Sequence, residues 1–309
     1  MTDRNRPRLV AVSQIPPDLR TALTQRYGLA DHLGGAAPGY DVAVTMSVFG
    51  ANAALMNTLP DLKLIACNGA GLERIDLIEA KRRGIAVCHT PDELAEDVAD
   101  GAIALTYAIM RRVVEADRFV RSGRWSKERM APSRRLAGKT VGIVGLGRIG
   151  RVVAQRAGAI GMHILYFGPK AKPNAPYPFV GNMLDLAARS DVLILSCPGG
   201  EATRHLVGQA VLEQLGPDGY LINIARGSVV DEAALIAALQ ERKIAGAALD
   251  VFISEPNLDP RFLALDNVVL QPHSASITHE TRAAMLARLI GDITAYAEGR
   301  PFHNAAATA

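Results

Sequence analysis

The chain has 309 residues, of which 49% are hydrophobic and 21% are charged, and its formal net charge is +3. This length favours two domains, each large enough for its own hydrophobic core, and the composition excludes a disordered or fibrous protein. A small positive charge without a dense run of Lys or Arg argues against nucleic acid as a partner.

The N-terminal part of the chain alternates between strand and helix patterns. Short β-rich runs cover residues 8–12, 41–45, 63–67 and 85–88, and helical patterns around 19–27, 52–58 and 72–83 lie between them. This alternation predicts a parallel α/β sheet. A longer helical pattern follows at about 93–122. Its start, Thr90-Pro91-Asp92-Glu93, has a proline in the first turn and acids beside it, which favours a helix N-terminus.

A second alternating series begins at residue 140. Its six strand-like runs are residues 140–144, 163–167, 192–196, 220–224, 246–250 and 268–270. Six strands interleaved with helices are the number in a complete dinucleotide-binding sheet. Between the second and third runs, residues 168–181 are rich in Pro, Lys and Gly and show no clear helical pattern. A last helix, at about 279–298, could return to the first domain, which would make that domain discontinuous.

A glycine-rich turn directly follows the first strand of this second series. It reads Gly145-Leu-Gly147-Arg148-Ile149-Gly150 and opens a helix. Residues without a Cβ allow the chain to reverse and a pyrophosphate to approach closely, and the helix N-terminus then supplies amide donors. A purely structural turn is the alternative, but the strand–turn–helix context favours nucleotide binding.

The end of the next strand bears on the choice of cofactor. An acid about 20 residues past the turn would bind a free ribose 2′-hydroxyl and repel a 2′-phosphate. Here that place is Gly168, followed by Pro169, Lys170 and then Lys172. We therefore expect NADPH to be preferred and NADH to be possible. A solvated basic loop without cofactor preference is the alternative.

A cation, an acid and an imidazole follow three of the later strands. Arg226 could hold a substrate carboxylate bidentately, His273 could donate a proton near neutral pH, and Glu255 could fix the imidazole tautomer. Together they match the needs of 2-keto acid reduction, whose hydride comes from nicotinamide. The plainer alternatives are a core histidine at His273 and a turn acid at Glu255. Asp250 could bind the nicotinamide amide or simply end its strand.

These motifs together resemble the D-isomer-specific 2-hydroxyacid dehydrogenase family over nearly the whole chain. The resemblance rests on the glycine turn and on three further segments: Asn223-Ile-Ala-Arg-Gly-Ser-Val-Val-Asp-Glu232, Ala248-Leu-Asp-Val-Phe252 with Glu255-Pro256, and Gln271-Pro-His273. It implies an α/β fold in which a Rossmann dinucleotide-binding domain, residues 105–282 with a dimerisation arm, is inserted into a flavodoxin-like substrate domain formed by residues 1–104 and 283–309. It also implies a homodimer, with Arg226 for substrate binding and Glu255–His273 as the acid–base pair.

The resemblance extends to the substrate side. The segment Asn68-Gly69-Ala70-Gly71-Leu72 is similar to the family's substrate loop, whose backbone N–H groups at 70–72 hold the carboxylate. Glu73 stands where an Asp is usual, and Ala275 stands where a Gly is usual. Arg124-Trp125 resembles the dimer arm of the glyoxylate/hydroxypyruvate reductase branch, in which the Trp reaches the partner's active site; an ordinary interface or core Trp is the alternative.

The expected cofactor contacts lie along the whole second series. They are Gly145, Gly147, Arg148, Ile149, Gly150, Gly168, Pro169, Lys170, Cys197, Thr203, Ile224, Ala225, Asp250, His273 and Ser276. We expect an NADPH-preferring reductase that converts glyoxylate or hydroxypyruvate to the D-2-hydroxy acid. An NAD-linked dehydrogenase for a bulkier, phenylpyruvate-type acid is the sister alternative, and a non-catalytic nucleotide-sensing protein of the same fold is the third.

The sequence also bears on location. Residues 1–8 are polar and lack the apolar core of a signal peptide. The apolar stretch 98–110 contains Asp100 and is too short to span a bilayer, so we expect no membrane partner. The cysteines have no framework spacing and indicate buried thiols in a reducing compartment: Cys67, Cys88 and Cys197. We therefore expect a cytoplasmic protein, and no bound metal.

Overall fold

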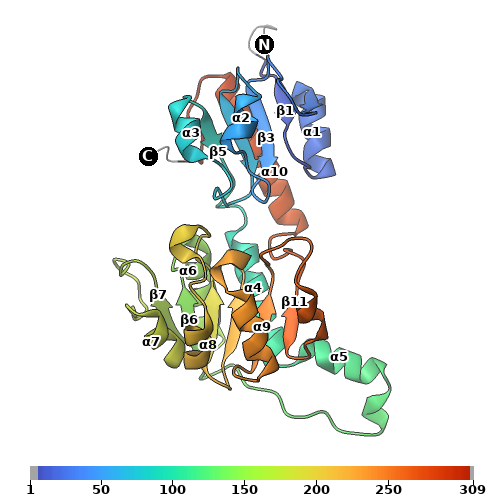
Figure 1. Cartoon of the computed structure of the whole chain (residues 1–309), viewed down its shortest axis with the longest axis vertical. Helices are drawn as coiled ribbons and strands as arrows, with labels where there is room; N and C mark the ends of the chain where they lie inside the picture. The colour runs from blue at the N-terminus through green and yellow to red at the C-terminus, as the bar shows by residue number, and fades with distance from the viewer. Residues whose placement is uncertain (1–5, 307–309) are drawn as a thin grey trace. The chain divides into compact units, whose positions relative to one another are not determined.

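The computed structural model describes residues 6–306 and divides the chain into two compact units (Figure 1). Unit 1 comprises Met1–Leu94 and Thr278–Ala309, and unit 2 comprises Ala95–Ile277. Residues 1–5 and 307–309 lie outside the described part. Most of the polar segment 1–8 and the outer ends of the expected substrate domain fall there too.

Unit 1 is a five-stranded parallel sheet with helices on both faces. Its strands are β1 (Leu9–Ala11), β2 (Leu29–Asp31), β3 (Val42–Met46), β4 (Leu64–Asn68) and β5 (Ala86–Cys88), in the order β2-β1-β3-β4-β5. Its helices are α1 (Pro17–Tyr27), α2 (Ala53–Asn57), α3 (Leu77–Arg82) and α10 (His279–Ala297). Neighbouring residues of β1 belong to different cores: Leu9 packs with residues of α1 and α10, and Val10 with residues from α2 and α3. The pleat of a strand directs successive side chains to opposite faces, so both faces of this sheet are covered.

Unit 2 is a six-stranded parallel sheet, again covered on both faces. Its strands are β6 (Thr140–Val144), β7 (His163–Phe167), β8 (Val192–Leu195), β9 (Tyr220–Asn223), β10 (Gly246–Leu249) and β11 (Val268–Leu270), in the order β11-β10-β9-β8-β6-β7. Its α-helices are α4 (Ala95–Met110), α5 (Val113–Arg121), α6 (Arg148–Ala159), α7 (Met183–Ala188), α8 (Gln209–Leu215) and α9 (Glu232–Gln240). The prediction of two doubly wound parallel-sheet domains is confirmed.

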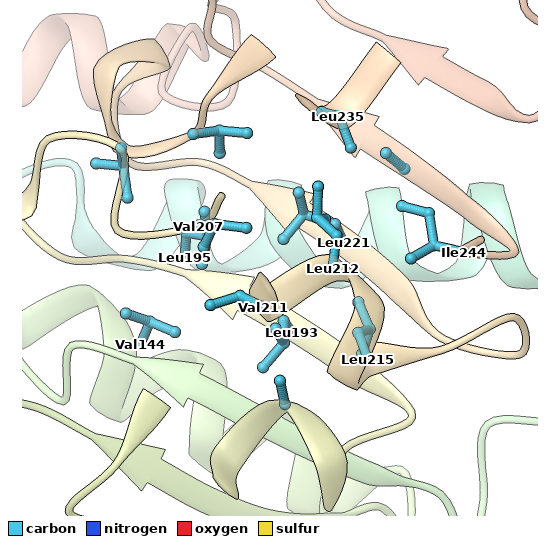
Figure 2. Packing of buried hydrophobic residues seen from close by; sticks show 14 of the residues in the cluster. Val144, Leu193, Leu195, Val207, Val211, Leu212, Leu215, Leu221, Leu235 and Ile244 are labelled. Atoms are coloured by element: carbon cyan, nitrogen blue, oxygen red, sulfur yellow. The ribbon is translucent and has the colours of Figure 1, made fainter. Parts of the chain in front are cut away.

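The core of unit 2 lies between the sheet and its helices. Figure 2 shows Leu193 and Leu195 of β8 and Leu221 of β9 among side chains of α8 and α9. Strand residues Leu193, Leu195 and Leu221 are 0% exposed. Because parallel strands buried on both faces need apolar side chains throughout, the near-continuous apolar runs of the sequence predicted these strands well.

The helical pattern 93–122 is wrong as a single helix. It forms α4, which starts at Ala95, and α5, which starts at Val113, and Arg112 between them has a left-handed φ of 54°. A right-handed helix cannot continue through that conformation. The first unit boundary lies at 94/95, whereas the sequence placed it at 104/105, because α4 packs on α6, β9 and β10 of unit 2.

Three further differences concern strand β2, the start of α3 and the second unit boundary. Strand β2 was missed because it is a three-residue edge strand without buried residues, so it has no apolar pattern. The helical pattern 72–83 begins only at Leu77, where Asp76 caps α3 by accepting the N–H of Glu79. The second unit boundary lies at 277/278, near Thr278, whose hydroxyl caps α10; the sequence placed it at 282/283.

Candidate active site

The glycine turn connects β6 to α6, at the point where the strand order of unit 2 reverses. Gly145 has a φ of 97°, and a Cβ there would lie 2.8 Å from the backbone N of Cys197. A Cβ on Gly150 would lie 2.1 Å from the carbonyl O of Gly145. Gly147 caps α6 without a side-chain hydrogen bond and has open space beside it. No side chain of Gly147 covers the N-terminus of α6, where an anion is favoured, and this shape fits a dinucleotide pyrophosphate.

The loop after β7 carries the expected determinants of cofactor choice. Tyr166 anchors this loop, because its buried hydroxyl accepts the N–H of Lys172 at 2.8 Å, and its backbone pairs with residues 178 and 180. Lys170 and Lys172 are exposed. A Cβ on Gly168 would meet no heavy atom closer than 4.0 Å. Unit 2 therefore has two exposed cations and no acid at this strand end, with room for a side chain at Gly168.

His273 and Glu255 form a direct pair in the loops after β11 and β10. The distance from His273 Nδ1 to Glu255 Oε2 is 2.8 Å, and the Phe252 N–H donates to Glu255 Oε1 at 2.9 Å. Burial raises the pKa of Glu255, but the hydrogen bonds from His273 and Phe252 and the nearby positive charges outweigh it, so this pKa lies below its ordinary value. The ionised Glu255 accepts a hydrogen bond from Nδ1–H of His273, which leaves Nε2 of His273 to face a reactant.

Arg226 belongs to the same cluster in unit 2. It follows β9, and its charge contributes to lowering the pKa of Glu255. The close approach depends on Gly227, because a Cβ there would lie 2.0 Å from the backbone C of Phe252. Only a residue without a side chain lets the Arg226 segment lie against the loop that carries Glu255.

The other expected cofactor residues line the same edge of the unit 2 sheet. Cys197 directly follows the Ser196 that ends the β8 run, and burial raises the pKa of its thiol to about 11. Ile224 and Ala225 are buried after β9, and Thr203 ends a short 3-10 helix where its hydroxyl donates to Pro198 O at 2.7 Å. Ser276 follows the His273 loop and is half-buried.

In unit 1, the expected substrate loop follows β4. Gly69 has a φ of 137°, and a Cβ there would lie 2.3 Å from Oγ of Ser47. Its N–H donates to Thr90 Oγ1 at 2.9 Å, and Thr90 N–H donates back to Gly69 O at 3.0 Å. Ala70, Gly71 and Leu72 are half-buried. The loop is thus bound to the segment after β5.

Trp125 lies in a 3-10 helix (Arg124–Ser126) beyond α5 and is 65% exposed. Figure 1 shows α5 and the chain after it extending outward from the edge of the unit 2 sheet. Arg124 stacks over Phe119 of α5, with 4.8 Å from the guanidinium carbon to the ring centroid. Of the alternatives for Trp125, a core position is wrong within this chain, because its side chain is solvent-exposed.

Comparison with known proteins places this geometry in a family. Residues 103–275 match the model of the D-isomer specific 2-hydroxyacid dehydrogenase NAD-binding domain. The chain belongs to the D-isomer specific 2-hydroxyacid dehydrogenase family. It is 42% identical to 2-ketogluconate reductase of Gluconobacter oxydans over 94% of this chain and 96% of that protein. It is 46% identical to glyoxylate/hydroxypyruvate reductase A of Arabidopsis thaliana over 81% and 80% of the two chains.

A solved structure of the family agrees. The NADPH-dependent glyoxylate/hydroxypyruvate reductase of Sinorhizobium meliloti, in complex with NADP and malonate, matches with a TM-score of 0.92 and 36% identity over 98% of this chain and 97% of that one. The expected family, fold and enzyme class are thereby confirmed. The cofactor is a nicotinamide dinucleotide, as the NAD-binding domain and the glycine turn require.

Three supporting side chains of this dehydrogenase were not singled out from the sequence. The Asn223 side chain stabilises the turn that carries Arg226, because it accepts the Ala225 N–H at 3.0 Å and donates to Arg226 O at 3.1 Å. Glu232 accepts Ile253 N–H at 2.7 Å in the Glu255 loop. In unit 1, Nδ1 of His89 lies 2.9 Å from the carbonyl O of Ala70 in the expected substrate loop. The spacing of Asn223 and Arg226, three residues apart after a strand, is the one local signal that could have indicated such a turn.

Asp250 holds the loop of His273. Its carbonyl accepts the His273 N–H at 2.9 Å, and its carboxylate accepts the Ser274 N–H at 2.7 Å. These bonds maintain His273 in a left-handed conformation with a φ of 53°. The methyl of Ala275, the departure from the family pattern, packs on Gly101 of α4, where a Cβ would lie only 2.9 Å from it. The glycine on α4 therefore leaves the room that the methyl needs.

Residues 6–306 were also expected to lack membrane-spanning and metal-binding features. No helix in this range is both long and apolar enough to cross a membrane. Within the same range, no group of three or more His, Cys, Asp or Glu side chains is placed to hold a metal ion.

Proposed function

We propose that this protein reduces a small 2-keto acid, glyoxylate or hydroxypyruvate, to the corresponding 2-hydroxy acid, which is the D-enantiomer for the chiral product of hydroxypyruvate. The observation that carries the proposal is the 2.8 Å pair between His273 Nδ1 and Glu255 Oε2, in the unit that also holds the glycine turn. A tautomer-fixed imidazole beside a nucleotide site is suited to general acid catalysis. The relatives from Arabidopsis and Sinorhizobium are named glyoxylate/hydroxypyruvate reductases and support the choice.

Each residue has a distinct part in the proposed reaction. The bound nicotinamide supplies the hydride. His273 donates the proton on Nε2 to the carbonyl oxygen, and Glu255 stabilises the charged imidazole before that transfer. Arg226 holds the carboxylate of the substrate. The carboxylate contact of the N–H groups of residues 70–72, which the family resemblance implies, stays a prediction. Asp250 keeps His273 in place, and its expected contact with the nicotinamide amide stays a prediction.

We further propose that NADPH is preferred over NADH. Lys170 and Lys172 are exposed on an anchored loop, and no acid stands at Gly168. Two cations favour a ribose 2′-phosphate, and the missing carboxylate removes the acceptor for a free 2′-hydroxyl. The Sinorhizobium reductase, described as NADPH-dependent and bound to NADP, supports this preference.

We also propose a homodimer built through the arm of unit 2. Val113 and Val120 of α5 are both 53% exposed, and Trp125 beyond them is 65% exposed. Such apolar side chains on an extended arm are typical of surfaces that a second copy covers. In the family arrangement, Trp125 then reaches the substrate of the partner. The free, buried cysteines support the expected reducing, cytoplasmic location: Cys67, Cys88 and Cys197.

One assay tests the proposed function and its main alternative. Oxidation of NADPH and NADH is followed with glyoxylate, hydroxypyruvate, pyruvate, phenylpyruvate and 2-ketogluconate as substrates. The last acid is included because a 2-ketogluconate reductase covers nearly this whole chain. We expect the highest kcat/KM with NADPH and glyoxylate or hydroxypyruvate. A higher value with NADH and phenylpyruvate would favour the NAD-linked alternative, and no turnover with any acid would favour the nucleotide-sensing protein.

A further inference from the structure

The substrate loop of unit 1 has its carbonyl groups held from one side. Gly69 O accepts the backbone N–H of Thr90 at 3.0 Å, and Ala70 O is 2.9 Å from Nδ1 of His89. Gly71 O is 3.9 Å from the thiol Sγ of Cys67. All three partners lie in β4 or directly after β5, so the successive carbonyls are directed toward the carboxyl ends of these two strands.

The direction of the carbonyls fixes the direction of the amides. In a planar trans peptide, the C=O of one residue and the N–H of the next point in opposite directions. The N–H groups of Ala70, Gly71 and Leu72 therefore point away from the strands. Among the hydrogen bonds found within residues 6–306, none uses these three N–H groups. They are left as adjacent donors for an anion.

The three bonds differ in strength. The Thr90 bond joins two backbone groups and so does not depend on a particular side chain at that position. The Cys67 thiol is a weak donor at long distance. His89 supplies a rigid ring, and because a carbonyl oxygen only accepts, Nδ1 must carry the proton. Its backbone is fixed as well, since His89 N–H donates to Asn304 O at 3.3 Å beside the Cys88–Ala305 bridge.

We infer that His89 is a positioning residue for substrate binding. Its Nδ1–H holds the Ala70 carbonyl and thereby directs the Gly71 N–H toward the carboxylate of the substrate. The inference rests on the proposed function, and it goes beyond it by assigning part of the substrate affinity to a side chain that does not touch the substrate. The effect should concern binding of the keto acid and leave binding of the cofactor unchanged, because the glycine turn belongs to unit 2.

The test compares three histidine variants. His89→Leu removes the donor at similar size, whereas His89→Asn keeps an amide N–H near the position of Nδ1. His32→Leu is the matched control, because it removes another histidine hydrogen bond of unit 1, the 2.9 Å contact of Nε2 with Thr58 Oγ1. For each protein we measure kcat and KM of the keto acid, the Kd of NADPH, the Tm, and the Kd of oxamate for the NADPH-saturated enzyme.

We expect His89→Leu to raise KM and the oxamate Kd about tenfold, with kcat reduced less than about threefold and the NADPH Kd unchanged. His89→Asn should remain within about twofold of wild type, and His32→Leu should change only the Tm. If His89→Leu does not fold, His89→Gln places its amide one bond further away and should give the same rise in KM. An unchanged KM, or an equal loss in His89→Asn, would overturn the inference. A wild-type enzyme inactive with every acid would instead refute the proposed function.

Discussion

The two sheets of this protein have the same kind of strand order, but different segments follow the strand at which each order reverses. Unit 1 runs β2-β1-β3-β4-β5, and unit 2 runs β7-β6-β8-β9-β10-β11. After β6 comes the glycine turn and an open helix N-terminus. After β1 come Ser13, Gln14 and Ile15, and then Pro16 and Pro17 open α1 without a side-chain cap.

The contrast shows what a binding turn requires beyond topology. Proline has no N–H, and the hydroxyl of Ser13 lies in the switch point of unit 1, 3.3 Å from both Met46 N and Thr45 Oγ1. Pro17 therefore removes one of the first amide donors of α1, and Ser13 contacts the neighbouring strand β3. In unit 1 the free donors lie instead in the loop after β4. A doubly wound sheet therefore offers a crevice at its switch point, and the local residues decide whether that crevice binds a ligand.

The largest effect should come from removing the proton donor of unit 2. We expect His273→Ala to lower kcat by about 1,000-fold, since general acid catalysis and the pair with Glu255 are both lost. NADPH should bind as before, because the glycine turn is intact. Steady-state kinetics and a fluorescence titration of NADPH measure the two quantities. Near wild-type turnover would remove His273 from the mechanism.

A second change disturbs the glycine turn of unit 2. Gly150→Ala places a methyl 2.1 Å from Gly145 O, so the turn must open and NADPH affinity should fall about 100-fold. Gly158→Ala is the control on the same helix, where a Cβ meets no atom within 4 Å. The control should bind NADPH normally and gain about 1 kcal/mol from helix propensity. Calorimetric titration and thermal melts distinguish the two, and equal NADPH binding would contradict the proposed role of Gly150.

The substrate cation gives a smaller effect. Arg226→Lys keeps the positive charge but loses the bidentate fork, so KM of glyoxylate should rise about 10- to 100-fold and kcat should also fall. The exposed Arg151 of α6 supplies the control variant Arg151→Lys, which should leave both constants unchanged. If KM is the same in wild type and Arg226→Lys, Arg226 does not hold the carboxylate.

Cofactor choice should respond to one residue at the end of β7. Gly168→Asp has room, since the nearest atom to its Cβ is 4.0 Å away, and the carboxylate should repel a 2′-phosphate and accept from a 2′-hydroxyl. Exposed pairs with Lys170 and Lys172 contribute about 1 kcal/mol each, so the wild-type preference for NADPH should be about 10- to 30-fold. Titration of both cofactors at low and high salt tests this, because screening should reduce the preference. Tighter NADH binding by the wild type at low salt would refute it.

The smallest effect concerns pH and the Glu255 carboxylate. Its pKa in the folded protein lies below the ordinary 4.5. Folding therefore gains stability from ionised Glu255 above pH 4.5, and this gain is lost as pH falls through the lower pKa of the folded state. Wild type should be more stable than Glu255→Gln near neutrality, and the difference should shrink below pH 4.5. Thermal melts of both proteins across this pH range measure the difference. If the bond to His273 did not favour the charged carboxylate, the difference in stability would grow below pH 4.5 and not shrink.

The parts that sequence could predict are those with local causes. The glycine turn was readable because a reversal at Gly145 and the contact at Gly150 each exclude a Cβ, whatever the rest of the fold does. The buried strands of unit 2 were readable because their residues must be apolar on both faces. Strand β2 and the break at Arg112 were not, since a short edge strand and a single left-handed residue leave no periodic signal.

By itself, the sequence determined the fold class, because backbone sterics and apolar periodicity act over a few residues. It also predicted the nucleotide turn and the candidate residues Arg226, Glu255 and His273. Tertiary structure decided how these residues meet. Through the tertiary structure, Gly227 lies against the backbone of Phe252, and the carboxylate of Asp250 accepts the N–H of Ser274 in the loop of His273. In the same way, His89 after β5 contacts the carbonyl of Ala70. Such contacts join segments far apart in the chain, and only the packing of whole sheets and helices fixes their distances.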